Sequence, residues 1–389
     1  MGSVSYIFGN GMDMQLGLPT QFEDFYTWVE INHKDVNNMF LPIKDNLIGK
    51  RLEWSDFESK FAVVISRFVK VTLDPSLIEK YEQEFDEDYT YVYNRFLNQE
   101  HDINNFLNEE FDVFIDLFQK YIEIINNYLS SKEDYDKKLE EIRKDLNKVN
   151  QLSINRPNVI NPVHENLLSG RDYNRKLNFF TLNYTNVVRD IFKLYGTEFT
   201  ITSRNNQIHI KKGDIAYLHG FLPKPNMDDG IVIGTHSIDD FDPAVREVIN
   251  DFDFCKFEYI KQIFGRTPYK KLTDILDNSH CIICYGVHLG HSDKSLKEIL
   301  YKNLTNNKEN ILIYYKHKSL TGARLAKKEY TLINETKDEL LYGFPDDVKE
   351  SIKDRIFIIP IRDSYNLIND NNMLLNSEDK SKIIGTKSD

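Results

Sequence analysis

The chain has 389 residues, of which 41% are hydrophobic, so it is long enough for about two to three domains with a substantial core. The formal net charge of −12 argues against a nucleic-acid groove or an anionic membrane surface, because both select clustered Lys and Arg. We therefore expect no membrane association and no direct nucleic-acid binding.

The beginning of the chain and its cysteines indicate the compartment. The first residues show no basic region, apolar stretch or cleavage site typical of a secretion signal. No apolar run approaches the roughly 18 residues of a membrane span. The three cysteines suit a reducing environment better than a disulfide framework. We expect a cytoplasmic protein.

Short apolar runs bounded by Gly, Pro or Asn predict the strands. Because several of these runs are apolar throughout rather than alternating, they are typical of parallel strands that are buried on both faces. We predict an α/β fold with a Rossmann-like, doubly wound, mostly parallel sheet. The predicted strands are Val4–Phe8, Leu177–Leu182, Ile215–Leu218, Ile231–Ile233, Cys281–Tyr285, Ile311–Tyr315 and Ile356–Ile361.

A large helical insertion is predicted between the first strand and the second, because aromatic and aliphatic residues recur there at helical spacing. Such a stripe usually packs into a core, and a protein-contact face is the alternative. The charged run at 130–150 predicts an exposed helix or hairpin arm. We divide the chain into 1–30, with the first strand and glycine loop, 31–160, the insertion, and 161–389, the remainder of the core. We expect the insertion to serve assembly or regulation rather than chemistry.

Glycines follow the first predicted strand at Gly9, Gly11 and Gly17, where they suit positive φ or a close approach to a ligand. A ligand loop and a plain structural turn are both open for this feature. Thr20 and Glu23 have the spacing of a capping box, which predicts a helix beginning near residue 20. The loop before that helix would be long enough to wrap around a ligand.

Polar residues also follow two other predicted strands. Asn183 comes directly after Leu177–Leu182, and it either binds a ligand or caps the next helix. His219 and Gly220 follow Ile215–Leu218. A histidine can exchange a proton near neutral pH, although a structural histidine is the alternative because nothing local supplies a second catalytic group.

A fourth strand, Cys281–Tyr285, leads into Gly286 and then into His288 and Asp293. Helix capping by Ser292 or Asp293 is the alternative to a ligand-binding role. Because ligands of open parallel sheets bind at the carboxyl ends of the strands, the four strand ends are predicted to form one site.

Cys281 and Cys284 form a single C-x-x-C inside a predicted strand. Residues three apart in a strand point to opposite faces, so the two thiols are not expected to share a metal ion. We interpret both as small core residues and expect no metal site.

Several of these motifs together resemble the abortive-infection AbiH proteins of bacterial phage defence. The matching stretches are GNGMDMQLGLPTQFEDF, NFFTLNYTNVV, YLHG, IVIGTHS and GVHLGHSD, with WSDFE at Trp54–Glu58 in the insertion. They occur in the same order and span the chain.

A more distant resemblance is to the sirtuins, whose motifs read GAGxSxxSGIPxF, TQNxD, HG and GTSL. It implies an NAD site in which Asn183 contacts ribose and His219 is catalytic. Asp13, Thr185 and Val287 depart from the sirtuin pattern, and the four-cysteine zinc module of sirtuin deacylases is missing. The matching positions are Gly9, Gly11, Gly17, Pro19, Asn183, His219 and Gly286.

The resemblance implies an NAD glycohydrolase without a metal, in which backbone N–H groups of the glycine loop approach the pyrophosphate. Asn183 would orient ribose and water, and His219 would act as general base. Asp13 would either bind ribose or stabilise the loop. The predicted cofactor-binding residues are Gly9, Asn10, Gly11, Asp13, Gly17, Pro19, Thr181, Gly220, Gly286, His288 and Asp293.

Two other functions remain open. One is a non-catalytic module that senses a nucleotide or binds a partner. The other is a nuclease, which would require more carboxylates for a metal than Asp13 and Asp293 provide. Besides NAD, the expected partners are further copies of the chain and a phage or host trigger protein.

Overall fold

The computed structural model describes most of the chain. The described residues are 3–41, 54–85, 89–98, 102–147, 175–203, 206–220, 230–235, 237–249, 254–256, 268–289, 293–316, 324–360, 368 and 372–386.

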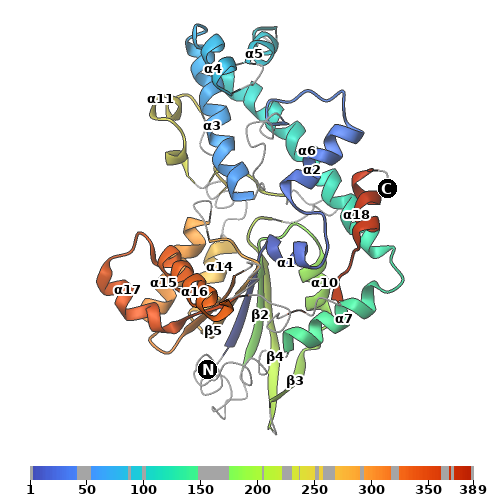
Figure 1. The fold of residues 1–389 in the computed structure, drawn as a ribbon, viewed down its shortest axis with the longest axis vertical. Coiled ribbons are helices and arrows are strands. Elements are labelled where there is room, and N and C mark those ends of the chain that lie inside the picture. The colour runs from blue at the N-terminus through green and yellow to red at the C-terminus, as the bar shows by residue number, and fades with distance from the viewer. Residues whose placement is uncertain are drawn as a thin grey trace.

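These residues form a seven-stranded sheet with the order β3-β4-β2-β1-β5-β6-β7 (Figure 1). Within it, β3 and β4 are antiparallel, and the other neighbouring pairs are parallel. The predicted Rossmann-like, mostly parallel sheet is confirmed. The strands are β1 (Ser3–Phe8), β2 (Lys176–Thr181), β3 (Glu198–Ser203), β4 (Asn206–Tyr217), β5 (Ser279–Tyr285), β6 (Ile311–Lys316) and β7 (Ile356–Pro360).

The order of the parallel strands defines where a ligand would bind. Without β3, the strands run across the sheet in the chain order third, second, first, fourth, fifth, sixth. This is the order of the dinucleotide-binding fold, in which the crevice opens where the strand order reverses. Here the reversal lies between β1 and β5.

The strand predictions differ from the structure in three places. The strand predicted at Ile215–Leu218 is the end of the longer β4. Ile231–Ile233 is not a strand, because its pairing with the described part of the chain is a single isolated bridge between Ile231 and Gly220. The edge strand β3 was not predicted. Ile361, at the end of the last predicted strand, lies outside the described residues.

Every regular element described between β1 and β2 is a helix. Figure 1 shows α3, α4 and α5 farthest from the sheet, with the long α6 running back toward the strand ends. The proposed boundaries at 31 and 160 stay predictions. Helix α2 extends across residue 31, and residue 160 lies outside the described residues. The helices are α1 (Asn10–Gln15), α2 (Phe22–Asn32), α3 (Trp54–Leu73), α4 (Leu77–Phe85), α5 (Tyr89–Asn98), α6 (Ile103–Ser130) and α7 (Tyr135–Leu146).

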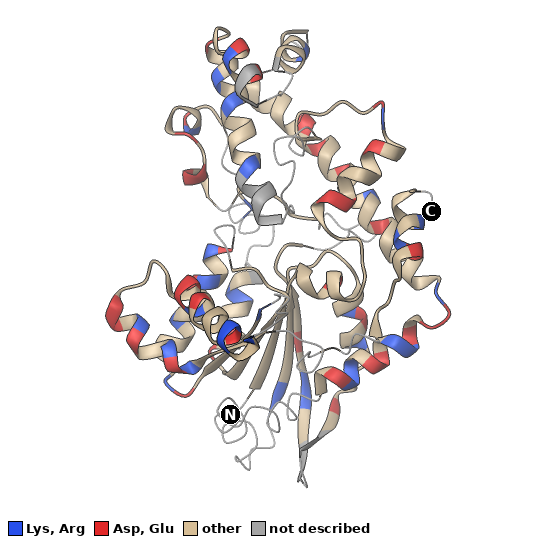
Figure 2. Ribbon diagram, viewed as in Figure 1, with Lys and Arg blue, Asp and Glu red and all other residues tan. Residues whose placement is uncertain are grey.

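The remaining helices follow β2. On the view shown in Figure 2, acidic and basic residues are interspersed on the outer helices. No helix in the described ranges is both long and apolar enough to span a membrane. The helices are α10 (Val187–Lys193), α11 (Pro243–Arg246), α14 (Pro268–Leu276), α15 (Lys294–Asn306), α16 (Leu325–Leu341), α17 (Asp346–Ile352) and α18 (Ser377–Ile384), with 3-10 turns η3 (Ile238–Asp240) and η4 (Lys353–Arg355).

Two hydrophobic clusters of described residues lie on the two faces of the sheet. Cys284 belongs to the cluster covered by α14, α15, α16 and α17, whereas Cys281 belongs to the cluster that includes α7 and α10. The prediction that the two thiols point to opposite faces and are buried is therefore confirmed.

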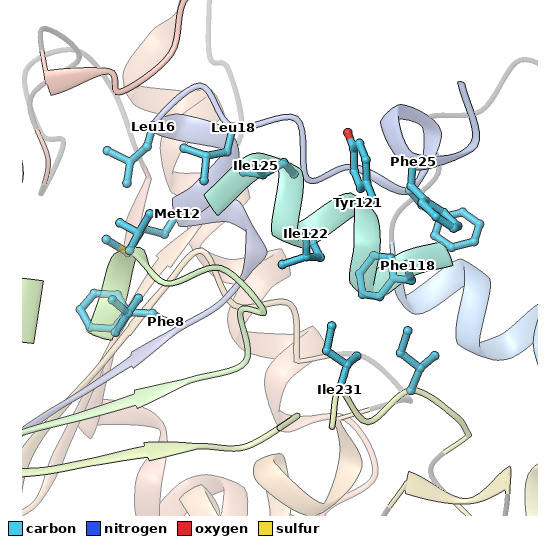
Figure 3. Packing of buried hydrophobic residues seen from close by; sticks show 14 of the residues in the cluster. Phe8, Met12, Leu16, Leu18, Phe25, Phe118, Tyr121, Ile122, Ile125 and Ile231 are labelled. Atoms are coloured by element: carbon cyan, nitrogen blue, oxygen red, sulfur yellow. The ribbon is translucent and has the colours of Figure 1, made fainter. Parts of the chain in front are cut away.

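The cluster that contains Cys281 continues from the sheet into the helical insertion. Figure 3 shows α6 between the loop that carries Leu16 and Leu18 and the segment at Ile231. The charged arm predicted at 130–150 contains α7, whose Tyr135, Leu139 and Ile142 are buried. The arm is therefore amphipathic rather than exposed on all sides.

Candidate functional site

The strand register brings the predicted site residues to one edge of the sheet. Phe8 on β1 pairs with Thr181 on β2 and Tyr285 on β5, and Thr181 also pairs with Tyr217 on β4. Neighbouring strands lie about 4.8 Å apart. Asn183 and His219, each two residues beyond a paired strand end, therefore leave the sheet at the same level.

Glycines permit two turns to pack closely at this edge. The N–H groups of Gly9 and Gly11 donate to the carbonyls of Tyr285 (3.0 Å) and Gly286 (2.9 Å). A Cβ on Gly9 would lie 2.5 Å from the Gly286 carbonyl oxygen. The expectation that the N–H groups of this loop approach a pyrophosphate is wrong for Gly9 and Gly11, because both groups are used inside the protein.

The loop after β1 also differs from the prediction in its helices. The short α1 begins at Asn10, directly after the strand, so no long open loop precedes the first helix. The capping box belongs to Gln21 and Asp24 of α2 rather than to Thr20 and Glu23. The helix predicted to begin near residue 20 is thus present, but it is the second one.

Three further residues of this loop have structural contacts that account for them. The Asn10 side chain donates to the Thr20 carbonyl at 2.9 Å, and the Pro19 carbonyl accepts from the Tyr121 hydroxyl at 2.6 Å. Gly17 has φ of 85°, and a Cβ there would meet the carbonyl of Leu375. These contacts fix the loop in place.

Asp13 on α1 is a buried carboxyl group at the edge of the sheet. One oxygen accepts from the Thr185 hydroxyl at 2.8 Å, and the other has no hydrogen-bond partner within the described ranges. Burial raises the pKa of Asp13 to about 7, although Thr185 and the nearby Asn183 amide oppose the shift. This carboxyl can therefore gain or lose a proton near neutrality.

Asn183 is buried with its side chain unsatisfied. Its backbone N–H donates to the Thr181 hydroxyl at 3.0 Å, so Thr181 helps to position Asn183. Neither polar atom of the Asn183 amide has hydrogen-bond geometry with a described residue, although the amide is close enough to Asp13 to lower the pKa of that carboxyl. The alternative role as a helix cap is not observed, since the N-cap of α10 is Asn186. Buried amides normally have partners, so this side chain is available for a ligand or ordered water.

His219 lies in a buried cluster of charges. Its Nε2 atom is 3.5 Å from Asp293 Oδ1 and 3.5 Å from Lys256 Nζ, and Lys256 Nζ is 3.8 Å from Asp293 Oδ1. Burial opposes ionisation of Asp293, but the Lys256 ammonium and then His219 hold the pKa of Asp293 below its ordinary value. His219 thus has two ionisable neighbours that the local sequence did not reveal.

Lys256 is a site residue that the sequence analysis missed. It is 2% exposed, and its backbone N–H donates to the Thr235 carbonyl at 3.0 Å in an isolated parallel bridge. The only local signal is a single basic residue inside the aromatic run FCKF. Lysines are rarely buried unless they are paired, so this pattern could have raised the question.

Of the other predicted positions, Asp293 belongs to this cluster, and Gly220 and His288 lie next to it in the chain or in charge. Gly220 has φ of 78° and allows the chain to turn toward Ile231. His288 is exposed and adds to the positive charges that lower the pKa of Asp293. Asp293 precedes α15 but makes no side-chain capping hydrogen bond. Ser292 lies outside the described residues.

A metal site is not assembled by the described side chains, where no three His, Cys, Asp or Glu residues are grouped suitably. The four strand ends nevertheless carry the stretches that identify the chain. Residues 5–315 match the family model described as Bacteriophage abortive infection AbiH. The chain belongs to the AbiH family.

The AbiH match extends from β1 into β6 and so includes all four strand ends. Membership indicates a role in abortive infection against bacteriophage. A comparison with proteins of curated function found no match. The AbiH chain's resemblance to sirtuins stays a prediction.

Proposed function

We propose that this AbiH protein is an NAD glycohydrolase that converts NAD and water to nicotinamide and ADP-ribose. The observation that carries the proposal is the buried, unsatisfied amide of Asn183 at the carboxyl edge of a sheet with dinucleotide-binding strand order. Asp13 and His219 supply ionisable groups at the same edge.

The reaction breaks the bond between the nicotinamide nitrogen and the ribose C1′ carbon. The bonding electron pair leaves with nicotinamide, and the ribose passes through an oxocarbenium-like state. A water oxygen then forms a bond to C1′ and releases one proton. In our proposal Asn183 orients the ribose and the water, and His219 accepts the proton directly or through a ribose hydroxyl.

Asp13 fits both roles that its sequence position left open. Its contact with Thr185 ties α1 to the turn after β2, which stabilises the loop. Its second oxygen has no partner in the described chain, so it is available to accept a hydrogen bond from a ribose hydroxyl. A cationic ribosyl group would also favour the ionised carboxylate, because opposite charges nearby lower a carboxyl pKa.

The second candidate is a non-catalytic module that senses a nucleotide. It is favoured by the charge cluster of His219, Asp293 and Lys256, which would also serve to hold the strand ends together. In this candidate the pocket binds NAD, and His219 transfers no proton.

Purified protein incubated with NAD distinguishes the two candidates. Chromatographic detection of nicotinamide and ADP-ribose in equal amounts supports the glycohydrolase. Binding of NAD by calorimetry without either product supports the sensing module instead. Because the zinc module of sirtuin deacylases is missing, an acetyl-lysine peptide should keep its acetyl group in the same reaction.

We further propose that activity is controlled by assembly, through further copies of the chain and a phage or host trigger protein. A cell needs to keep an NAD-consuming enzyme silent until infection, and assembly is one way to achieve this. Light scattering at micromolar concentration tests the first step. A strictly monomeric protein with full NAD-cleaving activity and no partner would contradict this control.

A further inference from the structure

Helix α6 of the insertion brings a polar side chain to the site. Asn126 is 6% exposed, and its Oδ1 accepts from the backbone N–H of Asn186 at 2.9 Å. Asn186 belongs to the turn after β2 that also contains Asn183. The insertion therefore contacts the same turn as the candidate ligand-binding amide.

The orientation of the Asn126 amide follows from this hydrogen bond. Only the carbonyl oxygen of an amide can accept from an N–H group, so the NH2 group occupies the other position. That NH2 group is buried and has no partner in the described part of the chain. A buried donor without a partner is unfavourable by itself and points to a ligand or a water.

Four unsatisfied atoms thus belong to three residues connected through one turn. Asn183 contributes a donor and an acceptor, Asn126 contributes a donor, and Asp13 contributes a carboxyl oxygen. Thr185 connects Asp13 to the turn, and Asn186 connects Asn126 to it.

The presence of two donors and two acceptors indicates the class of ligand group. None of the four atoms carries a positive charge, and the carboxyl of Asp13 would repel a phosphate. Each hydroxyl of a vicinal diol donates one hydrogen bond and can accept up to two, so a diol can pair with two donors and two acceptors. We propose that Asn126 donates to a hydroxyl of the ribose adjacent to the scissile bond, so that the insertion forms part of the ligand site. This assignment rests on the proposed NAD site.

The test compares ADP-ribose with ADP, which lacks the second ribose. Calorimetric titration of the full-length protein should show tighter binding of ADP-ribose. In Asn126→Asp, which keeps an oxygen for the Asn186 N–H but removes the donor, this preference should fall about five- to tenfold, as for loss of one hydrogen bond. Binding of ADP should change little.

Asn127→Asp is the matched control, because it adds the same charge at the next, exposed position of α6. It should keep the preference for ADP-ribose. Asn126→Leu removes the donor without adding a charge, but it also removes the acceptor of the Asn186 N–H, so its loss of preference should be at least as large as that of Asn126→Asp. Circular dichroism and the affinity for ADP report whether each variant is folded.

Equal binding of ADP-ribose and ADP by the unaltered protein, or no binding of either, would overturn the proposal. A preference unchanged in a folded Asn126 variant would overturn it as well. These measurements require no turnover. The glycohydrolase proposal can therefore fail while the ribose contact stands, and the reverse is also true.

Discussion

The Thr185 hydroxyl donates to a carboxyl oxygen of Asp13 at 2.8 Å, and both side chains are buried. This contact connects the helix after β1 with the turn after β2. It satisfies only one of the two carboxyl oxygens, and burial keeps the pKa of Asp13 near 7. The folded protein therefore holds a carboxyl group that ionises less readily than it does in the unfolded chain.

Replacing Asp13 with Asn should stabilise the fold at alkaline pH. The pKa is raised to about 7 in the folded protein, so the carboxyl destabilises the fold increasingly as pH rises from the unfolded value toward 7. Asp13→Asn should raise the free energy of unfolding at pH 8 by as much as about 4 kcal/mol. The gain should shrink as pH falls toward 4. Denaturant titrations at both pH values measure it.

The exposed Asp116→Asn on α6 is the control, and it should have little effect at either pH. The same Asp13→Asn protein should lose NAD cleavage if the carboxylate supports the ribosyl cation. A stability gain with full activity would leave Asp13 as a residue that only fixes the loop.

Asn183→Ala and His219→Ala should each abolish NAD cleavage while the fold stays intact. Loss of a general base lowers rates by about 10²–10⁴-fold. The Asn183 amide has no hydrogen bond of regular geometry with a described residue and interacts weakly with the Asp13 carboxyl, so the melting temperature of Asn183→Ala should fall little. Initial rates of nicotinamide release are compared with those of His209→Ala, an exposed histidine on β4. Full activity in either site variant would refute its assigned role.

Lys256→Met should be strongly destabilising at pH 8, because it leaves the Asp293 carboxylate buried without its ammonium partner. Breaking a buried pair in this way costs about 3–5 kcal/mol. Lys256 helps hold the pKa of Asp293 low, so without Lys256 that pKa rises and the carboxyl is protonated more readily. The loss should therefore be smaller at pH 5. Chemical denaturation at the two pH values tests the prediction.

The matched control for Lys256→Met is Lys271→Met. Lys271 lies 3.4 Å from Asp214, and both side chains are about half exposed. Exposed pairs contribute only about 0–1 kcal/mol. Equal losses in the two variants would show that the buried cluster adds no more stability than a surface pair.

Gly286→Ala should destabilise the fold far more than Gly343→Ala. Both glycines have positive φ, which costs an alanine about 1–2 kcal/mol. A Cβ at Gly286 would also lie 2.2 Å from the Met12 nitrogen, whereas at Gly343 no atom lies within 4 Å. Thermal melts of the two variants separate backbone strain from steric overlap. Similar melting temperatures would contradict the close packing of the two turns.

The fold was largely predictable because burial on both faces gives parallel strands continuous apolar sequences. The edge strand β3 was missed, since its EFTITS sequence alternates and it pairs only with β4. The short helix α1 was also missed. It contains a glycine, and the hydrogen bond from Gly11 to Gly286 that accompanies it comes from a distant turn. Local sequence does not show such tertiary contacts.

Part of the site was predictable for a similar reason. Asn183 and His219 are polar residues that directly follow apolar strand sequences, so the sequence alone indicates them as candidate site residues. Lys256 and Asn126 depend on distant partners, and Asn126 is followed by an exposed residue of the same type, Asn127. Only the helical period places Asn126 beside Ile122 on the buried face.

Helix α6 contacts both loops that border the sheet edge. Tyr121 donates to Pro19 in the loop after β1, and Asn126 accepts from Asn186 in the turn after β2. The helix has 28 residues and is therefore about 42 Å long. Glu110, near its other end, binds the backbone N–H of Met39. A displacement of the end of α6 that carries Glu110 would therefore move both loops together. The two loops cannot move apart from each other while the contacts of Tyr121 and Asn126 persist.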